Sequence, residues 1–125
     1  MQVIALVVAL TLLAALAALQ ALVAAGLPYG RLVWGGAHRV LPRRLRIGSA
    51  ISVLVYAGFA ALLLSRAGVL PGGDSGVVVV LSWLLFAYFA LGTVVNALSR
   101  SRAERLVMTP SCAVLAVASL VIALG

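Results

Sequence analysis

Apolar positions fill four long stretches of the chain, and polar positions gather in the short segments between them. The stretches cover about residues 3–25, 45–65, 77–98 and 109–125. A helix needs about 20 apolar residues to cross a hydrocarbon core of about 30 Å, which the stretches match or approach. None of them alternates apolar and polar positions as the strands of a barrel would. The pattern predicts an all-α, four-helix transmembrane bundle in a single domain, with antiparallel neighbours.

The fourth stretch is the shortest, and two start signals precede it. Thr109 and Pro110 fit a cap followed by a first-turn proline, which places the span at about 109–125. The alternative is a span that extends backward through Leu106, Val107 and Met108, with a kink at Pro110. Ser101 and Glu104 have the spacing of a capping box, so a short interfacial helix is expected to start there. Glu104 is the only acid in this connection, and we expect it to pair with a neighbouring arginine.

Charge is distributed unevenly over the three connections. The chain has a net charge of +7 and no lysine, and eight of its nine arginines lie in or beside the first and third connections. These are Arg31, Arg39, Arg43, Arg44, Arg46, Arg100, Arg102 and Arg105. Basic connections remain in the cytoplasm, so both termini are expected on the extracytoplasmic side. So strong a bias disfavours an antiparallel dimer, which needs both insertion orientations, and the placement of the charge disfavours nucleic-acid binding.

Composition excludes several classes of function. With 66% apolar and 9% charged residues, the chain does not fit a water-soluble globule. No ionisable side chain lies in the middle of a predicted span, which argues against pumps, proton-driven transporters and enzymes with buried acid–base groups. The single histidine, His38, and the single cysteine, Cys112, offer neither a haem ligand pair nor a metal cluster. We therefore expect no catalytic residues, no metal and no cofactor.

Two amides lie within the predicted spans, toward their cytoplasmic ends. Asn96 is the most polar side chain near a span interior, and Gln20 lies at a similar depth in the first span. An interhelical hydrogen bond between them would contribute about 0.6–2 kcal/mol. The alternative is a polar groove for a ligand, which Thr93, one turn before Asn96, would extend.

The first connection, from Gly26 to Arg44, combines aromatic, glycine and arginine residues. Aromatic rings with polar tips suit a membrane interface, and arginines can meet lipid phosphates. The purely structural interpretation is an interfacial turn, anchored by the aromatic and arginine side chains, in which Gly35 and Gly36 bend the chain. The sharper interpretation is recognition of a ligand or an anionic headgroup. The candidate contact residues are Tyr29, Trp34, Arg39, Arg43, Arg44, Arg46 and Asn96.

The two arginine-bearing connections resemble those of a group of small four-span bacterial integral membrane proteins. The matching residues are Gly26, Pro28, Gly30, Arg31, Trp34, Gly35, Gly36, Leu41, Pro42, Arg46, Ile47 and Ser49, followed by Asn96, Ser99, Ser101, Glu104, Arg105, Thr109 and Pro110. The resemblance covers nearly the whole chain and implies a bacterial membrane protein. It implies no activity and assigns no roles, although it draws attention to Trp34, Gly35, Gly36, Asn96 and Glu104.

Three functions follow as hypotheses. Alanine-rich faces on the first two spans allow close helix approach, which favours a non-enzymatic scaffold or accessory subunit of an inner-membrane assembly. Its partners would be a bilayer with anionic headgroups and either a membrane protein or a parallel homo-oligomer. The alternative is a carrier or binder of a lipid or small apolar molecule, between the bundle and the first connection. A membrane enzyme is the third, and it would require Glu104 and His38 to meet in a cavity.

Overall fold

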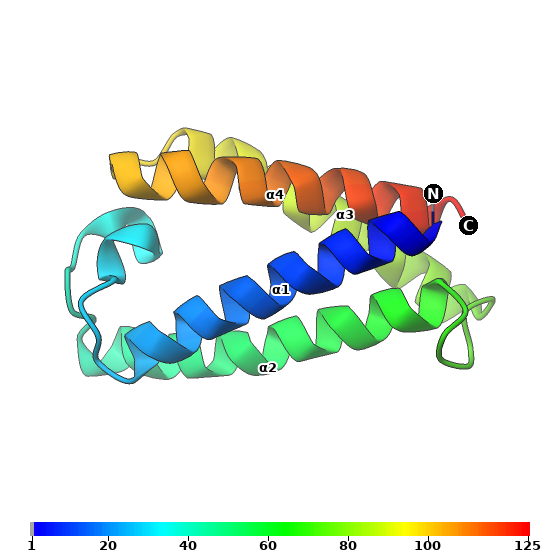
Figure 1. Ribbon diagram of the computed structural model, residues 1–125, viewed down its shortest axis with the longest axis horizontal. Helices are drawn as coiled ribbons and strands as arrows, with labels where there is room; N and C mark the ends of the chain where they lie inside the picture. Colours follow the sequence, from blue (N-terminus) through cyan, green and yellow to red (C-terminus); the bar gives the residue numbers. More distant parts are fainter. Residues whose placement is uncertain (1) are drawn as a thin grey trace.

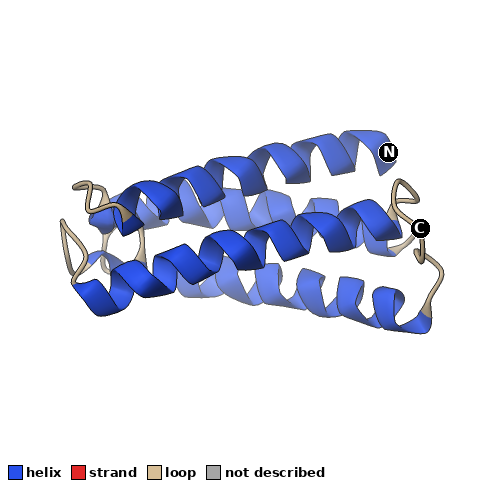
Figure 2. Ribbon diagram, turned by 90° about the horizontal axis from the view of Figure 1, so that it is seen from below, coloured by secondary structure: helices blue, strands red, loops and turns tan. Residues whose placement is uncertain are grey.

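The computed structural model describes residues 2–125, which form four long helices. These are α1 (Gln2–Ala24), α2 (Arg43–Arg66), α3 (Gly76–Ala97) and α4 (Arg102–Ala123). Consecutive helices run in opposite directions and pack as a bundle (Figures 1 and 2). Each is long and apolar enough to cross a membrane. The prediction of an all-α four-helix bundle is confirmed, and the four candidate spans indicate a multi-pass membrane protein.

The helices do not pack equally against one another. Helix α3 packs along α4 and α1 along α2, whereas α2 and α3 meet less extensively. The contact between α2 and α3 includes an aromatic cluster in which Phe59 lies between Tyr88 and Phe89, with ring centroids 5.5 and 5.8 Å away. Tyr88 and Phe89 of this cluster also line a cavity inside the bundle.

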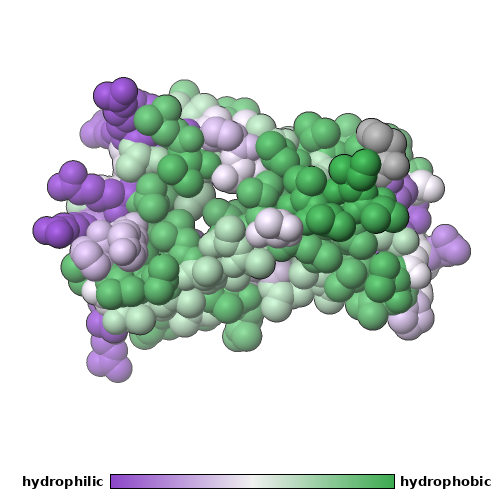
Figure 3. Space-filling model, in the orientation of Figure 1, coloured by the Kyte–Doolittle hydropathy of each residue, from purple (hydrophilic) through white to green (hydrophobic). Residues whose placement is uncertain are grey.

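The bundle surface is apolar around its middle and polar at its two ends, as Figure 3 shows. Inside, small and branched side chains at three- and four-residue spacing form the core, such as Ala9, Leu13 and Leu16 on α1. Outward-facing positions such as Leu54 and Val77 are equally apolar yet exposed. A helix surface that is apolar on all sides is suited to lipid rather than water.

Polar groups divide the bundle into two unlike ends. One end holds loop one, which we define as residues 25–42, together with the α3–α4 connection, residues 98–101 (Figure 1). Eight of the nine arginines belong to this arginine-rich end. The opposite end holds both termini and the α2–α3 connection, together with Arg66 and Asp74.

Helix α4 begins earlier than the expected start near Thr109. Its first residue is Arg102, and Pro110 lies inside the helix. The Ser101 hydroxyl accepts the Glu104 backbone N–H at 3.3 Å, so Ser101 is the N-cap that the capping-box pattern predicts. Because α4 is continuous through Pro110, Glu104 becomes part of a long helix that enters the bundle.

Arg66 ties the opposite end of the bundle together. Its guanidinium donates to the Ala123 carbonyl of α4 at 3.0 Å and to the Gly73 carbonyl at 3.3 Å. The last carbonyls of a helix have no partner within the helix, and the helix dipole favours a cation beside them. One side chain thereby joins the end of α2, the α2–α3 connection and the end of α4.

Replacing this arginine tests the tie. Arg66→Ala removes two charge-assisted hydrogen bonds, so we expect it to lower the free energy of unfolding by about 1.5–3 kcal/mol. Thermal unfolding in mild detergent measures the change. Arg44→Ala is the matched control, because Arg44 is exposed at the arginine-rich end. Equal unfolding temperatures for the two variants would contradict this role for Arg66.

Candidate functional site

Loop one is a compact structure built from two short 3₁₀ turns. These are η1 (Gly30–Leu32) and η2 (Trp34–Gly36). The Gly30 N–H donates to the Arg39 carbonyl at 2.8 Å, which folds the loop back on itself. A Cβ at Gly30 would lie 2.3 Å from the His38 carbonyl oxygen, so only glycine permits this close approach.

Three consecutive residues of loop one adopt the left-handed backbone region. Their φ angles are 53° at Trp34, 76° at Gly35 and 73° at Gly36. A tryptophan seldom adopts this conformation, so its surroundings must hold it. The Trp34 indole N–H donates to the Ser49 hydroxyl at 2.9 Å, and its ring lies against Gly48. Trp34 therefore fastens loop one to α2.

The same loop is attached to the start of α4. The Gly35 N–H donates to the Glu104 carboxylate at 3.0 Å, and the Ser101 hydroxyl donates to the Arg31 carbonyl at 2.7 Å. Gly36 packs so closely that an added Cβ would lie 2.2 Å from the Ser101 Cβ. Loop one thus lies across the arginine-rich end of the bundle, between α2 and α4.

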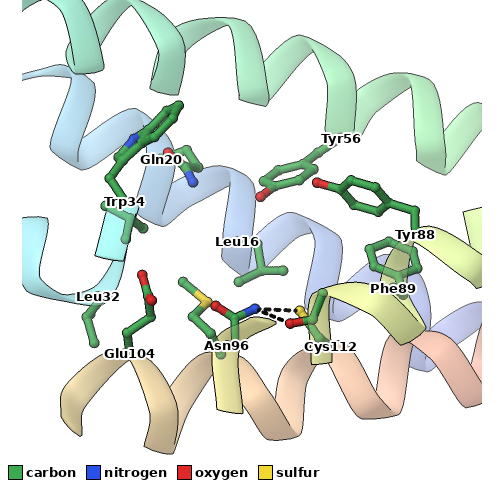
Figure 4. A pocket seen from close by; sticks show the side chains of 13 residues that line it. Leu16, Gln20, Leu32, Trp34, Tyr56, Tyr88, Phe89, Asn96, Glu104 and Cys112 are labelled. Atoms are coloured by element: carbon green, nitrogen blue, oxygen red, sulfur yellow. Dashed lines mark hydrogen bonds between the residues drawn. The ribbon is translucent and has the colours of Figure 1, made fainter. Parts of the chain in front are cut away.

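Beneath loop one lies a cavity of about 150 Å³. All four helices and loop one contribute to its wall, as Figure 4 shows. The lining residues are Leu16, Gln20, Leu32, Val33, Trp34, Tyr56, Tyr88, Phe89, Gly92, Asn96, Glu104, Met108 and Cys112. Residues four apart share one helix face, which explains how Gly92 and Asn96 of α3 come to line the same space.

Glu104 is the residue that sequence reasoning placed in a different environment. It is only 6% exposed and lines the cavity with Met108 and Cys112, at four-residue spacing on α4. In the described part of the chain no arginine pairs with it, so the expected ion pair is replaced by the Gly35 N–H. The four-residue spacing of Glu104, Met108 and Cys112 is the sequence signal that would have placed all three on one face of α4, which lines the cavity.

Gln20 and Asn96 both line this cavity, but the hydrogen bond expected between them is not formed. The Asn96 amide nitrogen donates to the Gly92 carbonyl at 2.9 Å and to the Cys112 sulfur at 3.3 Å. Gln20 is 8% exposed, and its buried side-chain oxygen has no hydrogen-bond partner. The Tyr56 hydroxyl lies near the Gln20 side chain without forming a hydrogen bond to that oxygen.

The other candidate contact residues lie outside the cavity. Tyr29 is exposed, and Arg39 lines an open basic cleft together with Arg31, Arg100 and Arg102. Arg44 is exposed as well. Of the seven candidate contacts, the structure brings only Trp34 and Asn96 into the cavity.

Two further arginines lie beside the end of α1. The Arg46 guanidinium donates to the Ala24 carbonyl at 2.9 Å, so it caps the C-terminus of α1. Arg43 borders the same outer depression near Ala24. Arg46 therefore has a clear structural partner within the chain, as Arg66 does at the opposite end.

The possible ligands of a metal ion and the possible acid–base groups lie apart among residues 2–125. No three histidine, cysteine, aspartate or glutamate side chains gather there as a metal ion would require. His38 is exposed and is not among the cavity-lining residues, so it does not meet Glu104. The polar side chains of the cavity wall are a carboxylate, two amides, two phenols, an indole and a thiol.

A matched pair of glycine variants tests whether loop one is docked on α4. Gly36→Ala and Gly35→Ala share the strain of a positive φ, but only the first places a Cβ against Ser101. We expect Gly36→Ala to be less stable than Gly35→Ala by about 1–3 kcal/mol, the usual cost of overpacking. Thermal unfolding of both in one detergent measures the difference, and equal stability would contradict the docked arrangement.

Comparison of the chain with protein-family models, with curated proteins and with solved structures finds no match. The resemblance noted from the sequence is supported only in its coarser part. The four long apolar helices indicate a small four-span membrane protein, and no family is identified.

Proposed function

We propose that this protein is a non-enzymatic membrane binding protein that holds a small molecule in the cavity beneath loop one. The observation that carries the proposal is the unpartnered oxygen of Gln20, which is buried in the wall of that cavity. A buried polar group without a hydrogen bond costs about 1–3 kcal/mol. A bound molecule that donates to this oxygen removes that cost.

The size of the cavity narrows the class of molecule. A cavity of about 150 Å³ accommodates a molecule of roughly the size of benzene. A whole lipid is far larger, so of the two ligand classes that the sequence suggests, a lipid or a small apolar molecule, the volume of the cavity favours the small molecule. The cavity wall is partly apolar and partly polar, because it includes Leu16, Phe89 and Met108 beside the polar side chains. Such mixed linings are typical of ligand pockets.

Binding without catalysis fits the groups present. A general acid or base acts with a positioned partner, and Glu104 is the only acid of the cavity wall. The Glu104 carboxylate accepts a hydrogen bond from the backbone N–H of Gly35, which is not a proton acceptor. This supports a binding role for Glu104 over a catalytic one.

Orientation and location are part of the same proposal. The arginine-rich end, with loop one above the cavity, faces the cytoplasm of a bacterial inner membrane, and both termini lie outside. The support is the arginine bias between the two ends, since retained basic connections set the orientation of short-loop proteins. The cavity is then closer to the cytoplasmic surface than to the outer one.

Filling the cavity tests the binding role. In Gly92→Leu the new side chain starts 3.6 Å from the Cys112 sulfur and extends into the cavity, whereas Gly58→Leu adds the same side chain where nothing lies within 4 Å. Native mass spectrometry of protein released from mild detergent detects retained small molecules. We expect wild type and Gly58→Leu to retain one, and Gly92→Leu to lose it.

Two results would overturn the binding role. One is a wild-type protein that emerges without any retained small molecule. The other is the same retained molecule in Gly92→Leu and in wild type, which would place it outside the cavity.

An accessory-subunit role is the second candidate, because an apolar groove of about 380 Å³ lies between α1 and α4. Alanines 5, 113 and 118 line it, and small residues let a helix of a partner protein approach closely. Cross-linking in membranes followed by native gels tests this role. We expect Ala113→Leu to abolish a cross-linked complex that Ala61→Leu, on the exposed face of α2, retains. Migration of wild type as a lone monomer would exclude it.

A further inference from the structure

The charge of the cavity wall restricts the chemical class of the ligand further. This inference rests on the proposed binding function. Of the cavity-lining residues only Glu104 is an acid, and none is an arginine or a histidine. The cavity therefore carries one negative charge when Glu104 is a carboxylate. The chain has nine arginines, yet those of the arginine-rich end lie outside this wall. An anionic ligand would meet repulsion here, and a cation would meet attraction.

Side-chain oxygens of Glu104, Gln20 and Asn96 are available as acceptors in the cavity wall, beside the Tyr56 and Tyr88 hydroxyls, which can both donate and accept. One Glu104 oxygen accepts the Gly35 N–H, and no donor engages the other among the described residues. The Gln20 oxygen is unpartnered, and the Asn96 nitrogen is already used by Gly92 and Cys112, which leaves the Asn96 oxygen as an acceptor. A ligand that satisfies them must bring several N–H or O–H donors. An ammonium group has three donors and no acceptor.

The aromatic rings of the cavity wall also favour a cationic ligand. Trp34, Tyr56, Tyr88 and Phe89 all belong to the cavity wall, and Figure 4 shows the carboxylate of Glu104 directed toward the space between Trp34 and Asn96. The face of an aromatic ring attracts cations, most strongly when water is excluded. A buried carboxylate is also costly unless it is paired, and a ligand cation would supply the pair.

We infer that the ligand is a small protonated amine with an apolar body, whose ammonium group binds the Glu104 carboxylate. The Gln20 and Asn96 oxygens receive the remaining N–H donors, and the apolar body lies against Leu16 and Phe89. Gly35 positions the carboxylate through its backbone N–H, so loop one shapes the site without contributing a charge to it.

The only cysteine of the chain gives a direct readout, because Cys112 lines the cavity. The probe is benzylamine, which is cationic at neutral pH, and the matched neutral probe is benzyl alcohol, of nearly the same shape. The purified protein is treated with methyl methanethiosulfonate, a small neutral thiol reagent, in the presence of each probe. The rate of Cys112 modification is followed by mass spectrometry, and the dose that halves the rate gives each affinity.

We expect benzylamine to protect Cys112 at a concentration at least about tenfold lower than benzyl alcohol, since each factor of ten corresponds to about 1.4 kcal/mol. Glu104→Gln keeps the shape and an acceptor for Gly35 but removes the charge, so it should bring the protective concentration of benzylamine to about that of benzyl alcohol. Arg102→Gln, on the exposed surface at the same end of α4, should leave the preference intact.

The failures of the two proposals are distinguishable. If both probes protect equally and Glu104→Gln changes nothing, the cavity binds small molecules without selecting cations, and the amine inference is wrong. If neither probe protects and Gly92→Leu leaves the modification rate unchanged, the cavity is not a binding site at all. If a variant folds poorly, ligand binding is measured instead on the wild-type protein through its unfolding temperature. A ligand that binds the native state raises this temperature. A larger rise with benzyl alcohol than with benzylamine would also overturn the inference.

Discussion

The hydrogen bond from the Gly35 backbone to the Glu104 carboxylate links the two features on which this structure is built. It holds loop one over the end of the bundle, and it fixes a carboxylate in the wall of the cavity below. In a capping box the same carboxylate would turn back to the N-cap backbone N–H. Here the Ser101 N–H donates to the Ser99 hydroxyl instead, which leaves Glu104 available for the loop. Glu104 therefore belongs both to the contact that attaches loop one and to the wall of the cavity.

The arginines of this chain have unlike tasks although the sequence presents them as one class. Arg46 and Arg66 each donate to a helix carbonyl and so stabilise a helix end inside the protein. Arg31, Arg39, Arg100 and Arg102 remain around an open cleft at the surface, where they are suited to meet anionic lipid. None of these arginines lines the cavity, and within residues 2–125 none forms an ion pair with Glu104.

Hydropathy was sufficient to predict the four helices and their packing as a bundle, because lipid leaves few alternatives for backbone polar groups. The site was only partly predictable. Trp34 and Asn96 stood out by residue type, and both line the cavity. Glu104 was expected among arginines because its burial depends on where loop one lies. That position is set by positive φ angles and by glycine contacts over long sequence separations, which no local pattern reveals.

An experimental structure of the protein in lipid, determined with benzylamine present, would show directly whether Glu104 binds the amine. We expect loop one to be docked on α4 and the amine nitrogen to lie within hydrogen-bonding distance of the Glu104 carboxylate, beneath Trp34. An arginine side chain bound to Glu104 in place of the amine, or a loop one that leaves the cavity collapsed and filled by apolar side chains, would contradict it.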